Sequence, residues 1–306
     1  ISPFAEGVLV TTFEDVGNGE VETLIEEGYA NINVNGLTGI DTPAQSKVGR
    51  FRVPFGRDNK LHVHDLIQVD RSFPVMNLVG EEGLIGDGLE LTLPLTHTED
   101  EDGLGSTTTV WLALVNGEMF TGEESLLGGL ADEAGVGLDS DAPVVVARAT
   151  QYVELDPRSD LEIGASYLDR LGSGAIETDM GTKVRPRMYG LDVTWRQRPE
   201  ENLVGSWLVT GEAVQTEFGY GRATAPGFPS GTDTRRGYSV TAQRQMTNTT
   251  YAGLRYGKTD VLGTAIEASD ISPYVSWYPT EFFRIRLQGQ HIETDPGRNA
   301  NRVFMQ

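Results

Sequence analysis

Hydrophobic and polar residues alternate with a period of two along most of the chain, which is the pattern of strands. Between residues 282 and 292, for example, Phe283, Ile285 and Leu287 alternate with polar residues. Successive side chains of a strand point to opposite faces, so each such segment has one apolar and one polar face. The pattern predicts strands at 7–13, 28–34, 46–55, 88–95, 107–116, 142–155, 160–170, 187–198, 202–216, 235–246, 249–259, 269–278 and 282–292, with a short one at 301–306. The best helical candidate is a short piece at 124–134.

The connections between these segments alternate in length. Short turns stand at 156–159, 199–201, 247–248 and 279–281, and longer links at 117–141, 171–186, 217–234 and 260–268. Strands that cross a membrane up and down in a barrel have brief turns at one rim and extended loops at the other. We therefore expect an all-β fold, a transmembrane antiparallel up-and-down barrel of about 14 strands within a range of about 12 to 16. Residues 1–306 would form this single domain.

Periodicity does not decide which face is outside, because a soluble barrel or sandwich would turn its apolar face inward. Aromatic residues beside the short turns favour the membrane, since transmembrane barrels carry aromatic girdles where lipid meets water. These residues are Trp195, Trp277, Tyr278, Phe282 and Phe283. The set predicted to face lipid is Phe51, Val53, Leu89, Leu91, Leu93, Leu191, Val193, Ile285 and Leu287.

The stretch 46–95 differs from the rest because roughly thirty residues separate its two strands, too many for a tight turn. Four glycines in it allow the backbone to fold back on itself: Gly80, Gly83, Gly86 and Gly88. We expect residues 56–87 to form a long loop folded into the barrel lumen.

Composition narrows the function classes. The chain has 37 glycines, no cysteine and a formal net charge of −21, and this charge disfavours binding to the phosphates of nucleic acids. No apolar run is long enough for a transmembrane helix, which needs about 18 residues. The acidic residues are expected on solvated loops: Glu14, Asp15, Glu20, Glu22, Glu26 and Glu27 near the start, and Glu99, Asp100, Glu101 and Asp102 in one run. The last strand, 301–306, is shorter than the about nine residues that span a bilayer, so we expect a truncated closing strand.

The motif Gly49-Arg50-Phe51-Arg52-Val53-Pro54-Phe55-Gly56 resembles a strand of porins of the phosphate-selective O and P type. Residues 59–64, 69–74 and 80–84 resemble related uncharacterised outer-membrane proteins of Gram-negative bacteria, as do 272–282 and 284–288. The resemblance implies a porin-like β-barrel in the bacterial outer membrane. The overall acidity departs from a phosphate-selective pattern.

Catalytic motifs are missing from the sequence. No Gly-x-Ser-x-Gly elbow, phosphate-binding loop or His-Glu-x-x-His occurs, and none of the four histidines lies in a recognisable catalytic setting. We expect no enzyme and no cofactor. His62 and His64 could present two imidazoles to zinc or copper from one face of an extended segment. Hydrogen bonding within the folded-in loop is the alternative that we favour.

The polar strand faces carry more basic than acidic groups, although the whole chain is acidic. The basic residues are Arg50, Arg52, Arg148, Arg196, Arg255, Arg284 and Arg286, against Glu90, Glu162, Asp192 and Glu212. Rings of charge set the selectivity of pores. We expect Asp65, Asp70, Glu81 and Glu82 of the long loop to meet wall arginines, because buried like charges without counter-ions are costly. The long loop would form a constriction in the lumen. The arginines either line the passage there or only pair with carboxylates and stabilise a plugged barrel.

These observations predict an outer-membrane porin for passive diffusion of small hydrophilic solutes or ions, with outer-membrane lipids around it. The alternative is a structural or docking barrel with a plugged lumen that binds another envelope component. A homo-oligomer is compatible with either function.

Overall fold

The computed structural model describes residues 4–17, 20–80, 82–120, 138–139, 142–171, 176–178, 183–199, 204–220, 231–261, 266–295 and 297–306. Fourteen strands make up the hydrogen-bonded path of its sheet. They are β1 Ala5–Gly17, β2 Glu20–Asn33, β3 Gln45–Arg52, β4 Ile85–Glu99, β5 Gly105–Val115, β7 Val144–Asp156, β8 Ser159–Arg170, β10 Lys183–Gln197, β11 Trp207–Tyr220, β12 Gly231–Gln245, β13 Thr250–Asp260, β14 Glu267–Thr280, β15 Phe283–Thr294 and β16 Arg298–Met305. Two short strands, β6 Leu138–Asp139 and β9 Ile176–Thr178, pair beside β10.

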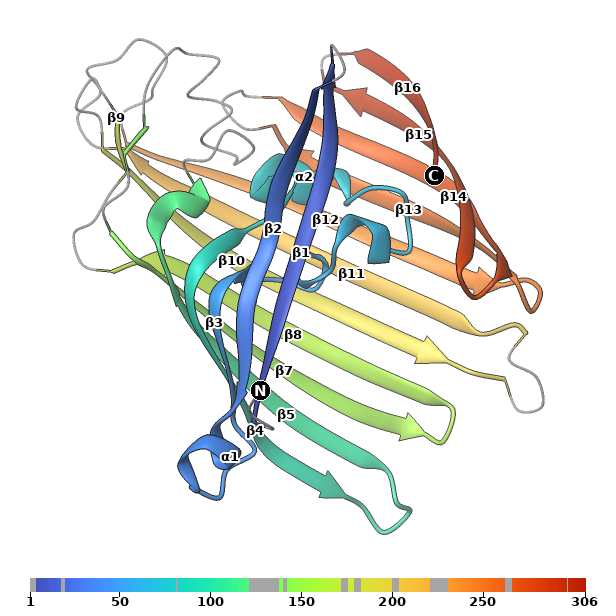
Figure 1. The fold of residues 1–306 in the computed structure, drawn as a ribbon. Helices are drawn as coiled ribbons and strands as arrows, with labels where there is room; N and C mark the ends of the chain where they lie inside the picture. Colours follow the sequence, from blue (N-terminus) through green and yellow to red (C-terminus); the bar gives the residue numbers. More distant parts are fainter. Residues whose placement is uncertain are drawn as a thin grey trace.

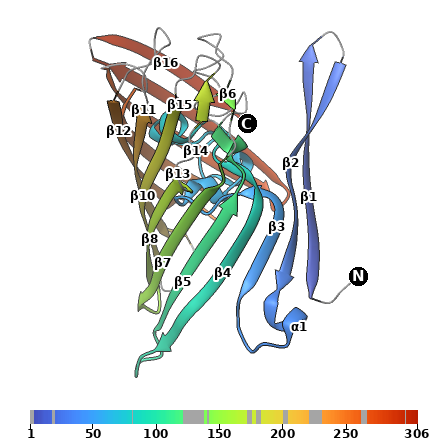
Figure 2. The ribbon, with the colours of Figure 1, turned by 90° about the vertical axis from the view of Figure 1, so that its left-hand side faces the viewer.

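Each long strand pairs antiparallel with its neighbour in sequence, from β1 to β16. The sheet curls around an interior that holds several short helices (Figures 1 and 2). The all-β, up-and-down barrel expected from the sequence is therefore confirmed, with all fourteen predicted strands present. The helix considered at 124–134 lies outside the described residues.

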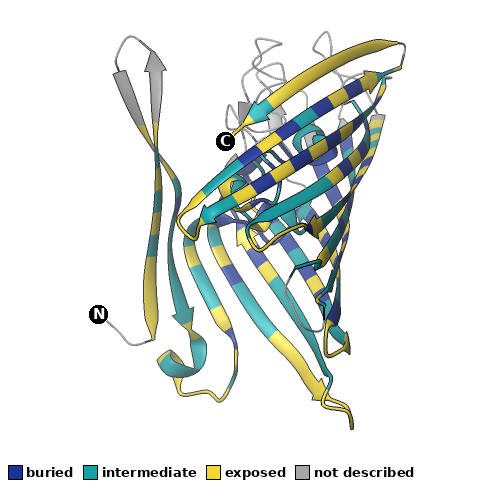
Figure 3. Ribbon diagram, turned by 90° about the vertical axis from the view of Figure 1, so that its right-hand side faces the viewer, coloured by how far each residue is buried: buried dark blue, intermediate teal, exposed yellow. Residues whose placement is uncertain are grey.

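Side chains along the strands alternate between the two faces of the sheet, and Figure 3 shows this as alternating bands of exposed and buried residues. In β10, Leu191 is 62% exposed while Asp192 and Thr194 are buried. Leu89, Val193 and Leu287 are also exposed. The apolar face is thus outside and the polar face inside, as the membrane interpretation requires.

Two of the predicted lipid-facing residues were placed wrongly. Phe51 and Val53 are wholly buried, in an interior cluster with Phe55 and Leu78. Phe51 lies on the inner face of β3, opposite to the exposed Val48 and Arg50, so the two faces of this strand were assigned in reverse. Val53 follows the end of β3 at Arg52, where the chain turns into the barrel. Val48 takes the exposed outer position on this strand.

The acidic stretch near the start is not a loop, contrary to expectation. β1 continues to Gly17 and β2 begins at Glu20, so Glu26 and Glu27 lie within a strand. The run 99–102 does sit at the turn between β4 and β5.

The helices are short: α1 Val34–Thr38, η1 Asp58–Lys60, η2 Val63–Asp65, α2 Phe73–Val79 and η3 Gly117–Phe120. In the described residues, no helix has the length and apolar character needed to cross a membrane.

Aromatic residues stand on the outer face near both rims. At the rim of the short turns, Trp207, Trp277, Phe282 and Phe283 are exposed. Near the other rim, the ring centroids of Tyr167 and Tyr189 lie 5.4 Å apart and those of Tyr238 and Tyr256 lie 6.3 Å apart. The second group was not anticipated from the sequence. Two such girdles are typical of barrels that cross a bilayer.

Leu191→Arg tests the orientation of the faces. Leu191 lies at the middle of β10, so a charge there should meet the bilayer midplane and lower the free energy of unfolding by about 2–4 kcal/mol. Leu155→Arg is the matched control, because Leu155 is also exposed, at 48%, but stands at the turn end of β7. Its expected cost is about 0–1 kcal/mol. Urea unfolding in lipid vesicles measures the free energy of unfolding of both variants. Equal losses would contradict the assignment of Leu191 to the lipid-facing side at the bilayer centre.

Candidate functional site

The connection between β3 and β4, residues 53–84, lies inside the barrel, and we call it the inserted segment. It contains η1, η2 and α2, and α2 packs against the inner faces of β11, β12 and β13 (Figure 1). The neck of the segment is closed by a backbone hydrogen bond of 3.0 Å from Val53 N to Leu84 O. The buried Asn59 side chain bonds the carbonyls of both residues and accepts from Leu84 N.

Wall glycines make room for this segment. A Cβ on Gly237 would lie 2.9 Å from Pro74 Cβ, and one on Gly257 would lie 2.8 Å from Pro74 Cδ. A Cβ on Gly190 would lie 3.2 Å from the Phe55 ring. The inner face is therefore hollowed where the inserted segment rests.

The Pro-Phe-Gly end of the resemblance motif has a structural cause. Gly56 has a φ of 63°, in the left-handed region that glycine tolerates. Its N–H donates to Ser166 Oγ at 3.0 Å, and a Cβ would lie only 2.0 Å from Glu212 Oε1. Glu212 also accepts from Asp58 N at 3.2 Å. Glycine at this position thus lets the chain turn inward against the wall.

Buried ion pairs tie the segment and its surroundings together. Arg255 donates to Asp70 Oδ1 at 2.9 Å and lies 3.8 Å from Asp270. Arg148 makes a bidentate pair with Asp192, at 2.6 and 2.9 Å. All of these groups except Asp70 have side chains no more than about 2% exposed.

Two further arginines bind backbone carbonyls of the segment. The guanidinium of Arg286 donates to Leu66 O at 2.6 Å and to Gln68 O, and Arg284 donates to His64 O. Arg286 is 1% exposed. These guanidinium groups are therefore occupied by protein atoms.

The segment also reaches β2. Arg52 Nη2 lies 3.3 Å from Glu26 and 3.9 Å from Glu82. His62 has one ring nitrogen 3.0 Å from Glu26 and the other 3.2 Å from Glu27. Glu81 lies outside the described residues. The predicted contact between wall arginines and loop carboxylates occurs at Arg52 and Glu82, whereas Asp70 meets Arg255 rather than Arg284 or Arg286.

His62 and His64 stack with ring centroids 5.2 Å apart. Among the residues that the structure describes, no three His, Cys, Asp or Glu side chains are grouped so as to hold a metal ion. The contacts of His62 are to Glu26 and Glu27 of β2, so this side chain connects the inserted segment to the wall rather than hydrogen-bonding within the segment.

The other predicted site residues stand apart from the centre. Arg50 shares the outer face with Val48, is 43% exposed and lies 3.5 Å from Asp87. Arg196 pairs with Asp160 near the short-turn end and is 40% exposed. Asp65 is exposed and lies 3.7 Å from His64.

Two basic residues of the segment were not predicted as site residues. Arg71 is buried and donates to the carbonyls of Asp58, Leu61 and Glu82, and burial lowers its pKa. Lys60 Nζ stands 4.2 Å from the ring centroid of Trp111 on β5. Lys60 is exposed to solvent, yet desolvation by the surrounding protein lowers its pKa. Both properties fit a side chain in a narrow water-filled space. Neither residue type nor spacing in the sequence distinguishes this lysine from a surface one.

Comparison with known proteins supports the fold. No family model matches the chain, and no curated protein matches its sequence. Among solved structures, the outer-membrane channel DcaP of Acinetobacter baumannii is similar with a TM-score of 0.59 and 14% identity, over 98% of this chain and 79% of that one. The anion-selective porin from Comamonas acidovorans gives a TM-score of 0.52 and 11% identity over 92% and 76% of the two chains. A loop-deletion form of OmpT, an outer-membrane protein of Vibrio cholerae, gives a TM-score of 0.53 and 10% identity, over 98% of this chain and 90% of that one. The chain thus has the fold of outer-membrane β-barrel channels.

Arg255→Met should loosen the inserted segment, because it leaves Asp70 and Asp270 without their cation. Removing one partner of a buried pair lowers the free energy of unfolding by about 3–5 kcal/mol. Urea unfolding in lipid vesicles measures this decrease, and protease cleavage within residues 56–80 shows whether the inserted segment has become accessible. Arg244→Met is the matched control, since Arg244 is exposed and lies over the Trp207 ring. Equal effects of the two substitutions would show that Arg255 does not anchor the segment.

Proposed function

We propose that this protein is a passive channel of the bacterial outer membrane for small hydrophilic solutes or ions, and that the inserted segment is its constriction. The observation that carries the proposal is the segment 53–84, which crosses the polar interior of an outer-membrane channel fold and is bound to its wall from β2 to β15. Outer-membrane barrels with polar interiors conduct water and solutes unless a plug closes them. No catalytic role is proposed for any residue.

In this proposal, the wall arginines have two roles. Arg52, Arg148, Arg255 and Arg286 are buried and bound to protein groups, so they stabilise the constriction instead of meeting solutes. Arg196 and Arg284 stand nearer the short-turn rim and form the entrance on that side. Lys60 is an exposed cation of the inserted segment.

The passage runs beside Lys60, between the segment and the wall of β3, β4 and β5. The charged groups that act on Lys60 are Lys47, Glu90, Arg148 and Glu162. Of these, Glu90 pairs with Lys47 at 3.6 Å and is buried, while Lys47 remains partly exposed. Two accessible lysines then face one accessible carboxylate, Glu162, which gives a weak preference for anions.

Single-channel recording tests the function directly. Purified protein in planar bilayers should give discrete conductance steps, because the proposed passage beside the segment is filled with water. A sealed docking barrel of the same fold should give none. Replacing Asn59 with leucine should release the neck and make the steps larger or noisier, with Asn248→Leu at an outer turn as the control. Absence of steps from a correctly folded protein would reject the channel.

Lys60→Met tests the selectivity. It removes one of two accessible cations, so the anion-to-cation permeability ratio should fall by about twofold or more. Lys258→Met is the matched control, because Lys258 is on the outer face. In the wild type, the anion preference should also weaken as pH rises, at a pH below the ordinary lysine range, since the lowered pKa of Lys60 makes it lose its charge earlier. Reversal potentials in a salt gradient measure both effects, and an unchanged ratio in Lys60→Met would place the passage elsewhere.

A further inference from the structure

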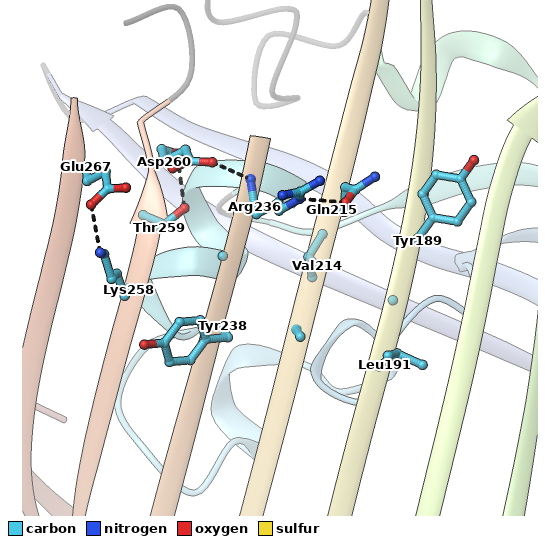
Figure 4. Close-up of a pocket in the computed structure, with 13 residues that line it drawn as sticks. Tyr189, Leu191, Val214, Gln215, Arg236, Tyr238, Lys258, Thr259, Asp260 and Glu267 are labelled. Atoms are coloured by element: carbon cyan, nitrogen blue, oxygen red, sulfur yellow. Dashed lines mark hydrogen bonds and ion pairs between the residues drawn. The ribbon is translucent and has the colours of Figure 1, made fainter. Parts of the chain in front are cut away.

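A groove of about 720 Å³ runs over β10 to β14 near the rim of the long connections (Figure 4). Its lining comes from the outer-face side chains Tyr189, Leu191, Ala213, Gln215, Arg236, Tyr238 and Lys258, with Asp260 and Glu267 at its edge. It is separate from the inserted segment, which lies on the other side of the same strands.

The strand register explains the shape of the groove. Leu191 pairs with Ala213, and Ala213 pairs with Tyr238. Ala213 is the smallest side chain of this row, so it forms an apolar floor between larger neighbours. Leu191 and Tyr238 are 62% and 45% exposed. The floor and walls therefore fit a hydrocarbon chain that lies along the barrel.

The end of the groove toward the rim carries a cation. Arg236 donates its Nε to Gln215 Oε1 at 2.7 Å, and its backbone N–H donates to Asp260 at 2.8 Å (Figure 4). Within the described part of the chain, neither Nη group of Arg236 has a hydrogen-bond partner. Lys258 adds a second cation, which is paired with Glu267 at 2.7 Å. A guanidinium with free donors is suited to bind a phosphate.

The position of the groove identifies the occupant. It is on the lipid-facing side and extends from the tyrosine girdle, where acyl chains end and head groups begin, toward Leu191 at the middle of β10. The long connections of outer-membrane barrels are extracellular, so this rim lies in the outer leaflet, which in such membranes consists of phosphorylated glycolipid.

We propose that this groove binds one phosphorylated glycolipid of the outer leaflet. One acyl chain lies on Ala213 between Leu191 and Tyr238, and a phosphate accepts hydrogen bonds from Arg236. Lys258 lies on the neighbouring strand β13, opposite Tyr238, so its ammonium group can bind the same phosphate in place of its partner Glu267. The inference rests on the proposed membrane location but not on conduction.

Native mass spectrometry of the full chain in detergent with added diphosphoryl lipid A tests the site. The wild type should retain one copy of lipid A, and Arg236→Gln and Ala213→Phe should each reduce the retained fraction at least about fivefold. The first removes the cation and the second fills the floor. The matched controls are Arg244→Gln and Ala242→Phe, which lie on the outer face of β12 toward the opposite rim. Both should bind as the wild type does.

Folding of each variant is checked by circular dichroism and by its electrophoretic mobility before and after heating. Full retention by Arg236→Gln and Ala213→Phe would overturn the proposal. Equal retention of phosphatidylglycerol by the wild type would overturn the assignment to a glycolipid. A sealed pore in bilayer recordings would leave lipid binding unchanged, so failure of the channel function and failure of this site give different results.

Discussion

Buried arginines bound to the inserted segment are the interaction on which the interior depends. A guanidinium removed from water is costly unless its donors are satisfied. The Nη groups of Arg255 donate to Asp70, and Nη1 of Arg286 donates to the carbonyls of Leu66 and Gln68. The wall and the segment therefore stabilise each other: without the segment, these wall arginines would lose the partners that make their burial tolerable.

Side-chain volume on the inner face decides where the segment can rest. Gly190, Gly237 and Gly257 leave hollows for Phe55 and Pro74. The apolar cluster around Phe51, Phe55 and Leu78 fills the space near this contact. Charge and shape thus act together, because the hollows place the backbone where the arginines can reach its carbonyls.

The two faces of the same strands meet different solvents. On β11 and β12, buried Val214 and Gly237 face the inserted segment, while Ala213 and Tyr238 on the alternate positions form the outer groove. Period-two alternation makes this possible, since neighbouring residues of a strand never share a face. One stretch of sheet can therefore carry the proposed constriction on its inner face and the proposed lipid site on its outer face.

The sequence by itself determined the strands and their up-and-down order, because these follow from local periodicity and from the lengths of the connections. Periodicity left open which face is outside, and the aromatic residues beside the short turns favoured an apolar outer face. It also predicted that residues 56–87 fold inward. It failed at Phe51, because alternation does not tell the two faces of a strand apart, and at Val53, because alternation continues through 46–55 although the strand ends at Arg52. The partners of Asp70, the exposure of Lys60 and the groove around Ala213 were decided by the tertiary structure alone. Each depends on residues far apart in sequence that come together only when the sheet curls, and no local pattern records that contact.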